Sequence, residues 1–255
     1  MAGPRLAIVT ATTNPARAEA CIASWGDWPT LIVVNGRSWT PDEAEALTTQ
    51  ARYVVSTSYL GSVGAFRLGV DHVLKEWQGA EVIACLHDDL ELHDPHWGEQ
   101  VLRHFDRQPA CGLAGFGGAL GLGDDDLYKK PYNPMQLARR HFRSNLTNAE
   151  AHGVRSLLPE RVACLDGFSQ VGRRAFWQGL KAHYPGNVIT GLDAMQGFRP
   201  WTALEQLGFR HHFYDGALGC LAARCGWETW YLPISGTHYG GRTAVGDPGY
   251  QDWAK

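Results

Sequence analysis

Short apolar runs alternate with amphipathic stretches through the first half of the chain. The runs are rich in β-branched residues and cover residues 6–10, 31–35, 53–56, 82–86 and 111–116. Stretches typical of helices lie between them, at residues 15–25, 41–50, 63–77 and 95–107. The runs are almost continuously apolar, which indicates strands buried on both faces. Strands that alternate with helices predict an α/β fold, with an open and mostly parallel sheet flanked by helices.

The second half has a weaker pattern. Residues 117–126 are rich in Gly and Asp, and residues 121–160 predict one long loop. Beyond the loop we expect strands at residues 162–165 and 228–232 and helices at residues 172–180 and 216–225. Nothing marks a boundary between independent domains. We therefore expect a single domain over residues 1–255, with ligands beyond the carboxyl ends of the parallel strands.

Composition removes several functional classes. The 255 residues carry 23 Lys and Arg against 26 Asp and Glu, a formal net charge of -3, which excludes a globally basic nucleic-acid binder. The six cysteines form no CxxC pair, so a disulfide framework and a thiolate zinc site are disfavoured. No run approaches the roughly 18 apolar residues of a transmembrane segment, and the amino terminus lacks the features of a signal peptide. These features predict a soluble cytoplasmic protein.

The strongest chemical signal is the sequence His87-Asp88-Asp89, directly after an apolar strand. Carboxylates at the end of a buried strand need a partner, because burial of an unpaired charge is costly. Oxygen ligands at a sheet edge suit Mg²⁺ or Mn²⁺. The alternative is a solvated turn, where Asp is common.

Glycines open the helix that follows the third strand, at Gly61 and Gly64, and Arg67 lies about one turn further on. Backbone amides at such a helix start can bind an anion, and Arg67 could reach a phosphate. Glycines at this position serve chain reversal at least as often as binding.

Two further signals lie near the carboxyl terminus. Asp215 precedes a helix, where it can cap the helix or act as a general base. His238 stands in the Gly-rich sequence 235–242, which predicts a loop able to close over a phosphate, although a lone His is more often structural.

From residue 6 to residue 242 the chain resembles the inverting nucleotide-sugar glycosyltransferases with the GT-A fold, the family that includes rhamnosyl- and galactofuranosyl-transferases. The resemblance rests on the sequences of residues 8–12, 32–36, 61–69, 87–89, 166–174 and 214–226, together with His238. It implies a nucleotide-binding half over about residues 1–116 and an acceptor-binding half over about residues 117–255. It implies donor-binding roles for Thr10, Ala11, Thr12, Asn35, Gly61, Gly64, Arg67 and Asp88.

The same resemblance implies a divalent cation, Mn²⁺ or Mg²⁺, on Asp89 and His238, and Asp215 as the catalytic base. Asp166, Gly167 and Phe168 fall in its acceptor-side segment. The chain departs from the family where His87 replaces the first Asp of the Asp-x-Asp motif and where Asn35 replaces an Asp.

The activity implied is metal-dependent, inverting transfer of a sugar from a nucleotide-sugar to an acceptor hydroxyl. Basic and aromatic residues of the long loop would suit an anionic acceptor, such as a polysaccharide, a lipid-linked molecule or a modified nucleic acid. They are Tyr128, Lys129, Lys130, Tyr132, Arg139, Arg140, His141, Phe142 and Arg143. A solvated surface is the alternative for this group. Two other functions stay open, a nucleotidyltransferase and a non-catalytic binder of sugar-nucleotides or carbohydrates.

Overall fold

The computed structural model describes residues 4–13, 15–36, 51–56, 58–121, 141–147, 153–179, 199–210 and 214–240. The predicted helix at residues 41–50 and the stretch from 122 to 140, with most of the basic and aromatic residues, lie outside the described residues.

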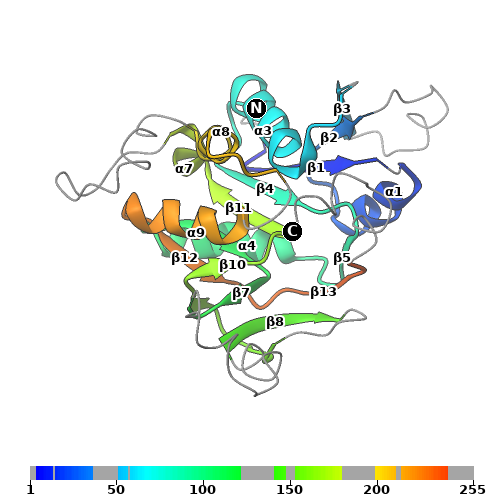
Figure 1. Ribbon diagram of the computed structural model, residues 1–255. Helices are drawn as coiled ribbons and strands as arrows, with labels where there is room; N and C mark the ends of the chain where they lie inside the picture. The colour runs from blue at the N-terminus through cyan, green and yellow to red at the C-terminus, as the bar shows by residue number, and fades with distance from the viewer. Residues whose placement is uncertain are drawn as a thin grey trace, which may run out of the picture.

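One large sheet forms the centre of the molecule (Figure 1). Its strands are β1 (Leu6–Thr12), β2 (Thr30–Asn35), β3 (Ala51–Ser56), β4 (Val82–Leu86), β6 (Cys111–Gly115), β9 (Glu160–Arg161), β11 (Ser169–Arg173) and β12 (Glu228–Tyr231). They lie in the order β3-β2-β1-β4-β11-β6-β12-β9. Strands β3, β2, β1 and β4 are parallel, as the sequence predicts. Strand β11 runs antiparallel to both of its neighbours, β4 and β6.

Helices cover both faces of this sheet. Successive residues of a strand are therefore buried on opposite sides. Ile8 of β1 belongs to one apolar core and Val9 to the other. The helices are α1 (Pro15–Ser24), α3 (Gly61–Glu76), α4 (Trp97–Arg107), α7 (Arg174–Gln178), α8 (Pro200–Gln206) and α9 (Tyr214–Arg224). The Val9 core includes residues of α3, α7, α8 and α9, and the Ile8 core includes residues of α1 and α4. In the described part of the chain, no helix has the length and apolar character needed to cross a bilayer.

A second sheet is built from short strands. They are β5 (Leu90–Leu92), β7 (Gly117–Ala119), β8 (Phe142–Thr147), β10 (Cys164–Leu165) and β13 (Ser235–His238), in the order β10-β7-β8-β13-β5. Of these, β10 falls within the strand that the sequence predicts at residues 162–165, and the other four are not predicted. Strand β8 lies inside the predicted loop 121–160, and β13 lies in the predicted loop 235–242. Both expectations are therefore wrong for these residues. Strands β7, β8 and β13 are short and polar or Gly-rich, and their pairing with distant segments sets their structure.

The predicted helix at residues 172–180 begins later, at Arg174, because residues 169–173 pair with β4 and β6 as a central strand. Two arginines from this junction hold helix ends. Arg173 donates hydrogen bonds to the carbonyls of Phe105 and Gln108 at the end of α4. Arg174 donates to those of Leu74, Trp77 and Ala80 at and beyond the end of α3. These contacts give both guanidinium groups structural partners at helix ends.

Candidate functional site

The polar sequence after β4 is held between the two sheets. After Leu86 the chain turns, with the Leu90 amide donating to the His87 carbonyl, and it enters the second sheet as β5. Strand β13 pairs antiparallel with β5, and its register sets His238 opposite Leu90. The Tyr239 amide also donates to the Asp89 carbonyl at 2.9 Å. This pairing brings His238 beside Asp89, across 149 positions of sequence (238 minus 89).

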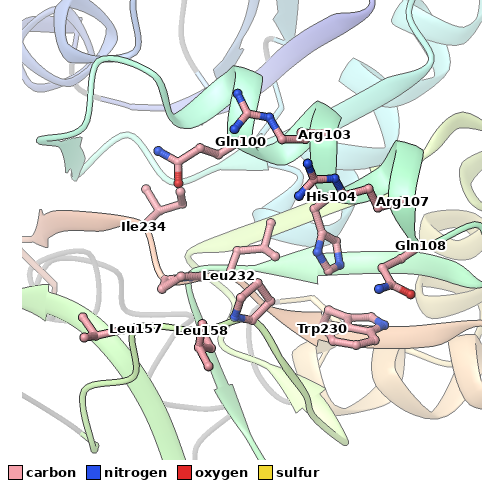
Figure 2. Close-up of a pocket in the computed structure, with 12 residues that line it drawn as sticks. Gln100, Arg103, His104, Arg107, Gln108, Leu157, Leu158, Trp230, Leu232 and Ile234 are labelled. Carbon is pink, nitrogen blue, oxygen red and sulfur yellow. The ribbon is translucent and has the colours of Figure 1, made fainter.

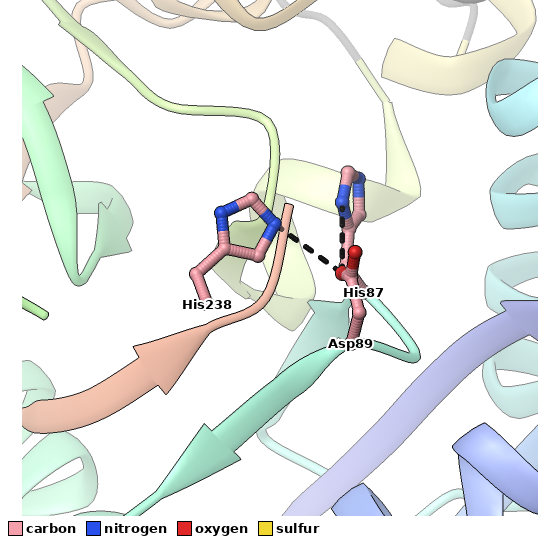
Figure 3. Close-up of side chains that lie close together, drawn as sticks. All are labelled: His87, Asp89 and His238. Atoms are coloured by element: carbon pink, nitrogen blue, oxygen red, sulfur yellow. Dashed lines mark ion pairs between the residues drawn. The ribbon is translucent and has the colours of Figure 1, made fainter. Parts of the chain in front are cut away.

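His87, Asp89 and His238 form a compact cluster of metal-ligating groups (Figure 3). Asp89 Oδ1 lies 3.2 Å from His238 Nε2 and 3.8 Å from His87 Nδ1. One ligand atom from each residue lies within 4.8 Å of the other two. Asp89 is 5% exposed, and the His238 side chain is 16% exposed. A buried carboxylate between two imidazole nitrogens has the donor chemistry of a divalent metal site.

A tyrosine hydroxyl sets the orientation of His87. Tyr214 Oη donates to the Gly167 carbonyl at 3.0 Å and lies 3.0 Å from His87 Nε2. The single hydrogen of this hydroxyl is donated to the Gly167 carbonyl, so the oxygen acts as an acceptor toward His87. The imidazole proton is therefore on Nε2, which donates to Tyr214 Oη. His87 Nδ1 then presents its lone pair on the side of Asp89. This is the tautomer that a metal ligand needs, with the other ring nitrogen fixed by a hydrogen bond.

Gly167 makes this contact possible. A Cβ atom at residue 167 would lie 2.5 Å from Tyr214 Oη, closer than Cβ atoms approach other atoms in proteins. Burial raises the pKa of Tyr214 well above its usual value, and the carboxylates of Asp215, Asp166 and Asp89 act in the same direction. The hydroxyl therefore keeps its proton and remains a donor to Gly167.

A small hollow of about 60 Å³ opens beside the cluster and shares His87 with it. Its wall contains four of the predicted donor-binding residues, Ala11, Thr12, Asn35 and Asp88. Thr12 Oγ1 donates to Asp88 Oδ2 at 2.5 Å, which ties the end of β1 to the end of β4. The hollow therefore lies at the carboxyl edge of the parallel strands, where ligands of such sheets bind.

The other four predicted donor-binding residues do not line this hollow. Thr10 is fully buried inside β1, because that strand continues to Thr12. The Arg67 guanidinium lies 2.7 Å from Glu205 and 3.6 Å from Asp71, so two carboxylates already neutralise it. Arg67 therefore stabilises the contact between α3 and α8 in this structure.

Gly61 and Gly64 shape the turn into α3. Gly61 has a φ of 70°, a conformation that favours glycine. The Asn35 side chain accepts from the Leu60 amide at 2.8 Å and donates to the Gly61 carbonyl at 3.4 Å. Asn35 thus orders the helix start. The Val63 amide, one of those that the sequence suggested for binding an anion, already donates to the Arg210 carbonyl.

The predicted base, Asp215, directly follows Tyr214, the residue that contacts His87 of the cluster. It lies in the first turn of α9, and its Oδ1 accepts from the Gly216 amide at 2.8 Å. Because Tyr214 contacts His87, Asp215 and Asp89 belong to the same region of the molecule.

The predicted acceptor-side residues surround the same cluster. The Phe168 ring lies over the His238 ring, with centroids 4.7 Å apart. The Phe168 carbonyl accepts from the His87 amide, and Gly167 holds Tyr214. The Asp166 amide donates to Gly117 in the second sheet. Of the predicted basic and aromatic loop residues, His141, Phe142 and Arg143 are described, and Arg143 pairs with Glu160 at 3.0 Å.

Several residues of the site are not predicted from the sequence. His87 stands in place of the first Asp of the family motif, and its position directly before Asp88-Asp89 at a strand end is the signal for its role as a ligand. Thr13, Tyr59, Ser62 and Phe66 complete the wall of the hollow. Ser62 lies at the predicted glycine-rich helix start, but Phe66 carries no polar signal that sequence reasoning could use.

The sequence matches no known protein family and no curated protein. Solved structures do match. A mannosyltransferase, PcManGT from Pyrobaculum calidifontis, in complex with GDP-mannose and Mn²⁺, matches 98% of this chain with 60% of its own, at 14% identity and a TM-score of 0.50. The TarS fragment 1–349 from S. aureus matches 92% of this chain with 60% of its own, at 7% identity and a TM-score of 0.49.

A synthetase is also among the matches. The synthetase of CMP-2-keto-3-deoxy-manno-octonic acid, in complex with CTP, covers 91% of this chain with 90% of its own, at 9% identity and a TM-score of 0.45. This chain spans 60% of the length of the mannosyltransferase and of the TarS fragment. The match to the mannosyltransferase, with the sheet order described above, confirms the GT-A-like α/β fold predicted from the sequence.

Proposed function

We propose that this protein is a metal-dependent, inverting glycosyltransferase that uses a nucleotide-sugar donor. The observation that carries the proposal is the cluster of His87, Asp89 and His238, which adjoins the hollow at the strand ends and contacts the first residue of α9. This arrangement supports a metal site, a donor site and a carboxylate base in one region. The hollow lined by Thr12 and Asp88 is called the donor hollow below.

The ligand set favours Mn²⁺ over Mg²⁺. Mg²⁺ is held mainly through oxygen atoms and keeps several waters, whereas imidazole nitrogen suits transition-metal ions. Because two of its three groups are imidazoles, the cluster supports Mn²⁺ as the first of the two predicted ions to test. When bound, such an ion neutralises the negative charge that develops on a diphosphate leaving group.

The residues of the chain would act as follows. Thr12 and Asp88 shape the floor of the donor hollow, and the Tyr214 hydroxyl holds His87 in its ligand tautomer. Asp215 accepts the proton of the acceptor hydroxyl as that oxygen bonds to the anomeric carbon. The bond from the anomeric carbon to the diphosphate oxygen breaks, and the nucleoside diphosphate leaves with the electron pair. General-base assistance of this kind contributes about 10²–10⁴ in rate.

A panel of nucleotide-sugars tests the proposal. The purified protein is incubated with GDP-, UDP- and dTDP-sugars and Mn²⁺, and release of nucleoside diphosphate is measured. GDP-mannose is the first candidate, because PcManGT was solved with it. We expect diphosphate release from at least one donor, and its loss in Asp89→Asn and in excess chelator. The exposed residue His96, at the start of α4, provides the control variant His96→Ala.

The other two functions give different results when nucleoside triphosphates and sugar phosphates are included in the panel. A nucleotidyltransferase would release pyrophosphate from a nucleoside triphosphate and a sugar phosphate. A non-catalytic binder would show thermal stabilisation by a nucleotide-sugar without release of any product. Either result, or full activity in chelator, would contradict the proposal.

A further inference from the structure

A second and larger hollow lies away from the metal cluster, between helix α4 and the chain that follows β12 (Figure 2). Its volume is about 500 Å³, and none of its lining residues belongs to the cluster or to the donor hollow. We call it the α4 groove. One wall is the polar side of α4, and the other is formed by two aliphatic segments, at residues 157–159 and 232–234.

The second wall exposes aliphatic side chains to an unusual degree. Leu157 is 88% exposed and Leu158 is 71% exposed, the highest values among the large hydrophobic residues that the structure describes. Leu232 and Ile234 lie deeper in the groove and are almost completely buried. Adjacent exposed leucines above an apolar floor mark a surface that binds an apolar partner.

The charges of the groove come from α4. Arg103 and Arg107 are four residues apart, so they project from the same side of the helix. No carboxylate lines the groove, and within the described residues neither guanidinium makes an ion pair. Burial lowers the pKa of His104, between them, to about 4, so this imidazole is neutral at neutral pH. The groove therefore combines two positive charges with an aliphatic wall.

We propose that the α4 groove docks the protein on an anionic lipid surface. Arg103 and Arg107 bind lipid phosphate groups, and Leu157 and Leu158 enter the adjoining apolar layer. A free phosphate would leave the leucines without a role, and a neutral apolar ligand would leave the arginines without one. The half-buried ring of Trp230, whose Nε1 donates to Glu228, suits the same boundary between apolar and polar surroundings. The proposal is independent of sugar transfer.

Vesicle binding by the full chain tests this proposal. The protein is sedimented with vesicles of phosphatidylcholine alone and with vesicles that also contain phosphatidylglycerol. We expect binding to the phosphatidylglycerol vesicles only. R103Q/R107Q should weaken binding about 30-fold, which corresponds to about 1 kcal/mol for each basic residue near an anionic surface. L157S/L158S should weaken binding about tenfold or more, because two leucines lose their burial.

Matched variants separate docking from general effects. R52Q/R199Q removes two arginines that lie outside the groove and changes the net charge by the same amount. L207S replaces a leucine that is 41% exposed, also outside the groove. Both should bind vesicles like the unchanged protein, and thermal unfolding confirms that each variant folds.

Several results would overturn the proposal. Absence of binding, or equal binding to both kinds of vesicle, would exclude an anionic lipid surface as the partner of the groove. An equal loss in R52Q/R199Q would show an effect of net charge alone. Unchanged binding in L157S/L158S, or displacement from vesicles by millimolar inorganic phosphate at constant ionic strength, would show a phosphate site without a lipid contact.

Discussion

The Tyr214 hydroxyl is the residue-scale feature that links the metal cluster to helix α9. It fixes the His87 tautomer, and loss of such a contact to a metal ligand typically costs 10- to 100-fold in metal affinity. We therefore expect Tyr214→Phe to weaken Mn²⁺ binding by about 10- to 100-fold, measured by titration with the electron paramagnetic resonance signal of free Mn²⁺.

Tyr231→Phe is the control for this change. Tyr231 is also fully buried and its hydroxyl donates to a backbone carbonyl, that of Ser156, but it lies in β12, outside the cluster. It should leave the Mn²⁺ affinity unchanged. Equal affinity in the Tyr214 and Tyr231 variants would show that His87 does not depend on the tyrosine contact.

Asp215 carries the second prediction at this scale. Asp215→Asn removes the proton acceptor but keeps an oxygen that can accept from the Gly216 amide. We expect the transfer rate to fall by about 10²–10⁴ while the affinity for the nucleoside diphosphate changes little. Asp106→Asn, a surface carboxylate paired with Arg5, is the comparison and should transfer at the normal rate. Normal transfer by Asp215→Asn would exclude this residue as the base.

At the scale of elements, sequence reasoning succeeded where a segment carries its own signal. The apolar runs that become β1, β2 and β4 are buried on both faces, and their pattern is sufficient to predict them. Strands β7 and β13 contain the sequences Gly-Gly-Ala and Ser-Gly-Thr-His, which have no strand pattern. Their structure depends on partners far away in the sequence.

The candidate site divides in the same way. Asp88 and Asp89 were predictable because they end a buried strand. The pairing of His238 with Asp89 depends on the register between β13 and β5, which no local pattern contains, and it was predicted only through the family resemblance. The partners of Arg67 were equally invisible, because Glu205 lies on a helix that the sequence did not reveal.

Arg174 provides a prediction about elements. Its guanidinium donates hydrogen bonds to three backbone carbonyls at and beyond the end of α3. A positive charge at this end also complements the helix dipole. Arg174→Met should lower the free energy of unfolding by about 2 kcal/mol, because hydrogen bonds to a charged group are lost and carbonyls remain unpaired. Lys75→Gln changes a side chain that is 82% exposed and should alter stability by less than about 0.5 kcal/mol. Denaturant unfolding measures both, and equal stabilities would contradict the capping role.

At the scale of the whole molecule, the metal cluster joins parts of the chain that lie far apart in the sequence. His87 follows a strand of the large sheet, and His238 ends a strand of the second sheet. A bound ion would therefore stabilise the contact between the sheets. At 100 times its dissociation constant an ion adds about 2.7 kcal/mol, which for a chain of this size raises the unfolding midpoint by about 5–11 °C. His238→Ala should abolish this Mn²⁺-dependent shift, and His96→Ala should keep it. A shift that survives in His238→Ala would place the ion elsewhere.

The stability of the whole molecule should also depend on pH through His104, a residue of α4 whose ring packs against Trp230 of β12. Burial and the nearby charge of Arg173 lower its pKa to about 4, and Glu228 opposes them weakly. An unfolded chain would have a His pKa of about 6.5, so between pH 6.5 and 4 the unfolded state binds more protons than the folded state. Stability therefore falls as the pH drops through this window, by about 1–2 kcal/mol after allowance for partial exposure. His104→Gln cannot bind that proton, so its unfolding free energy should fall less from pH 7 to pH 4.5. Parallel curves for the two proteins would show that His104 does not contribute to acid sensitivity.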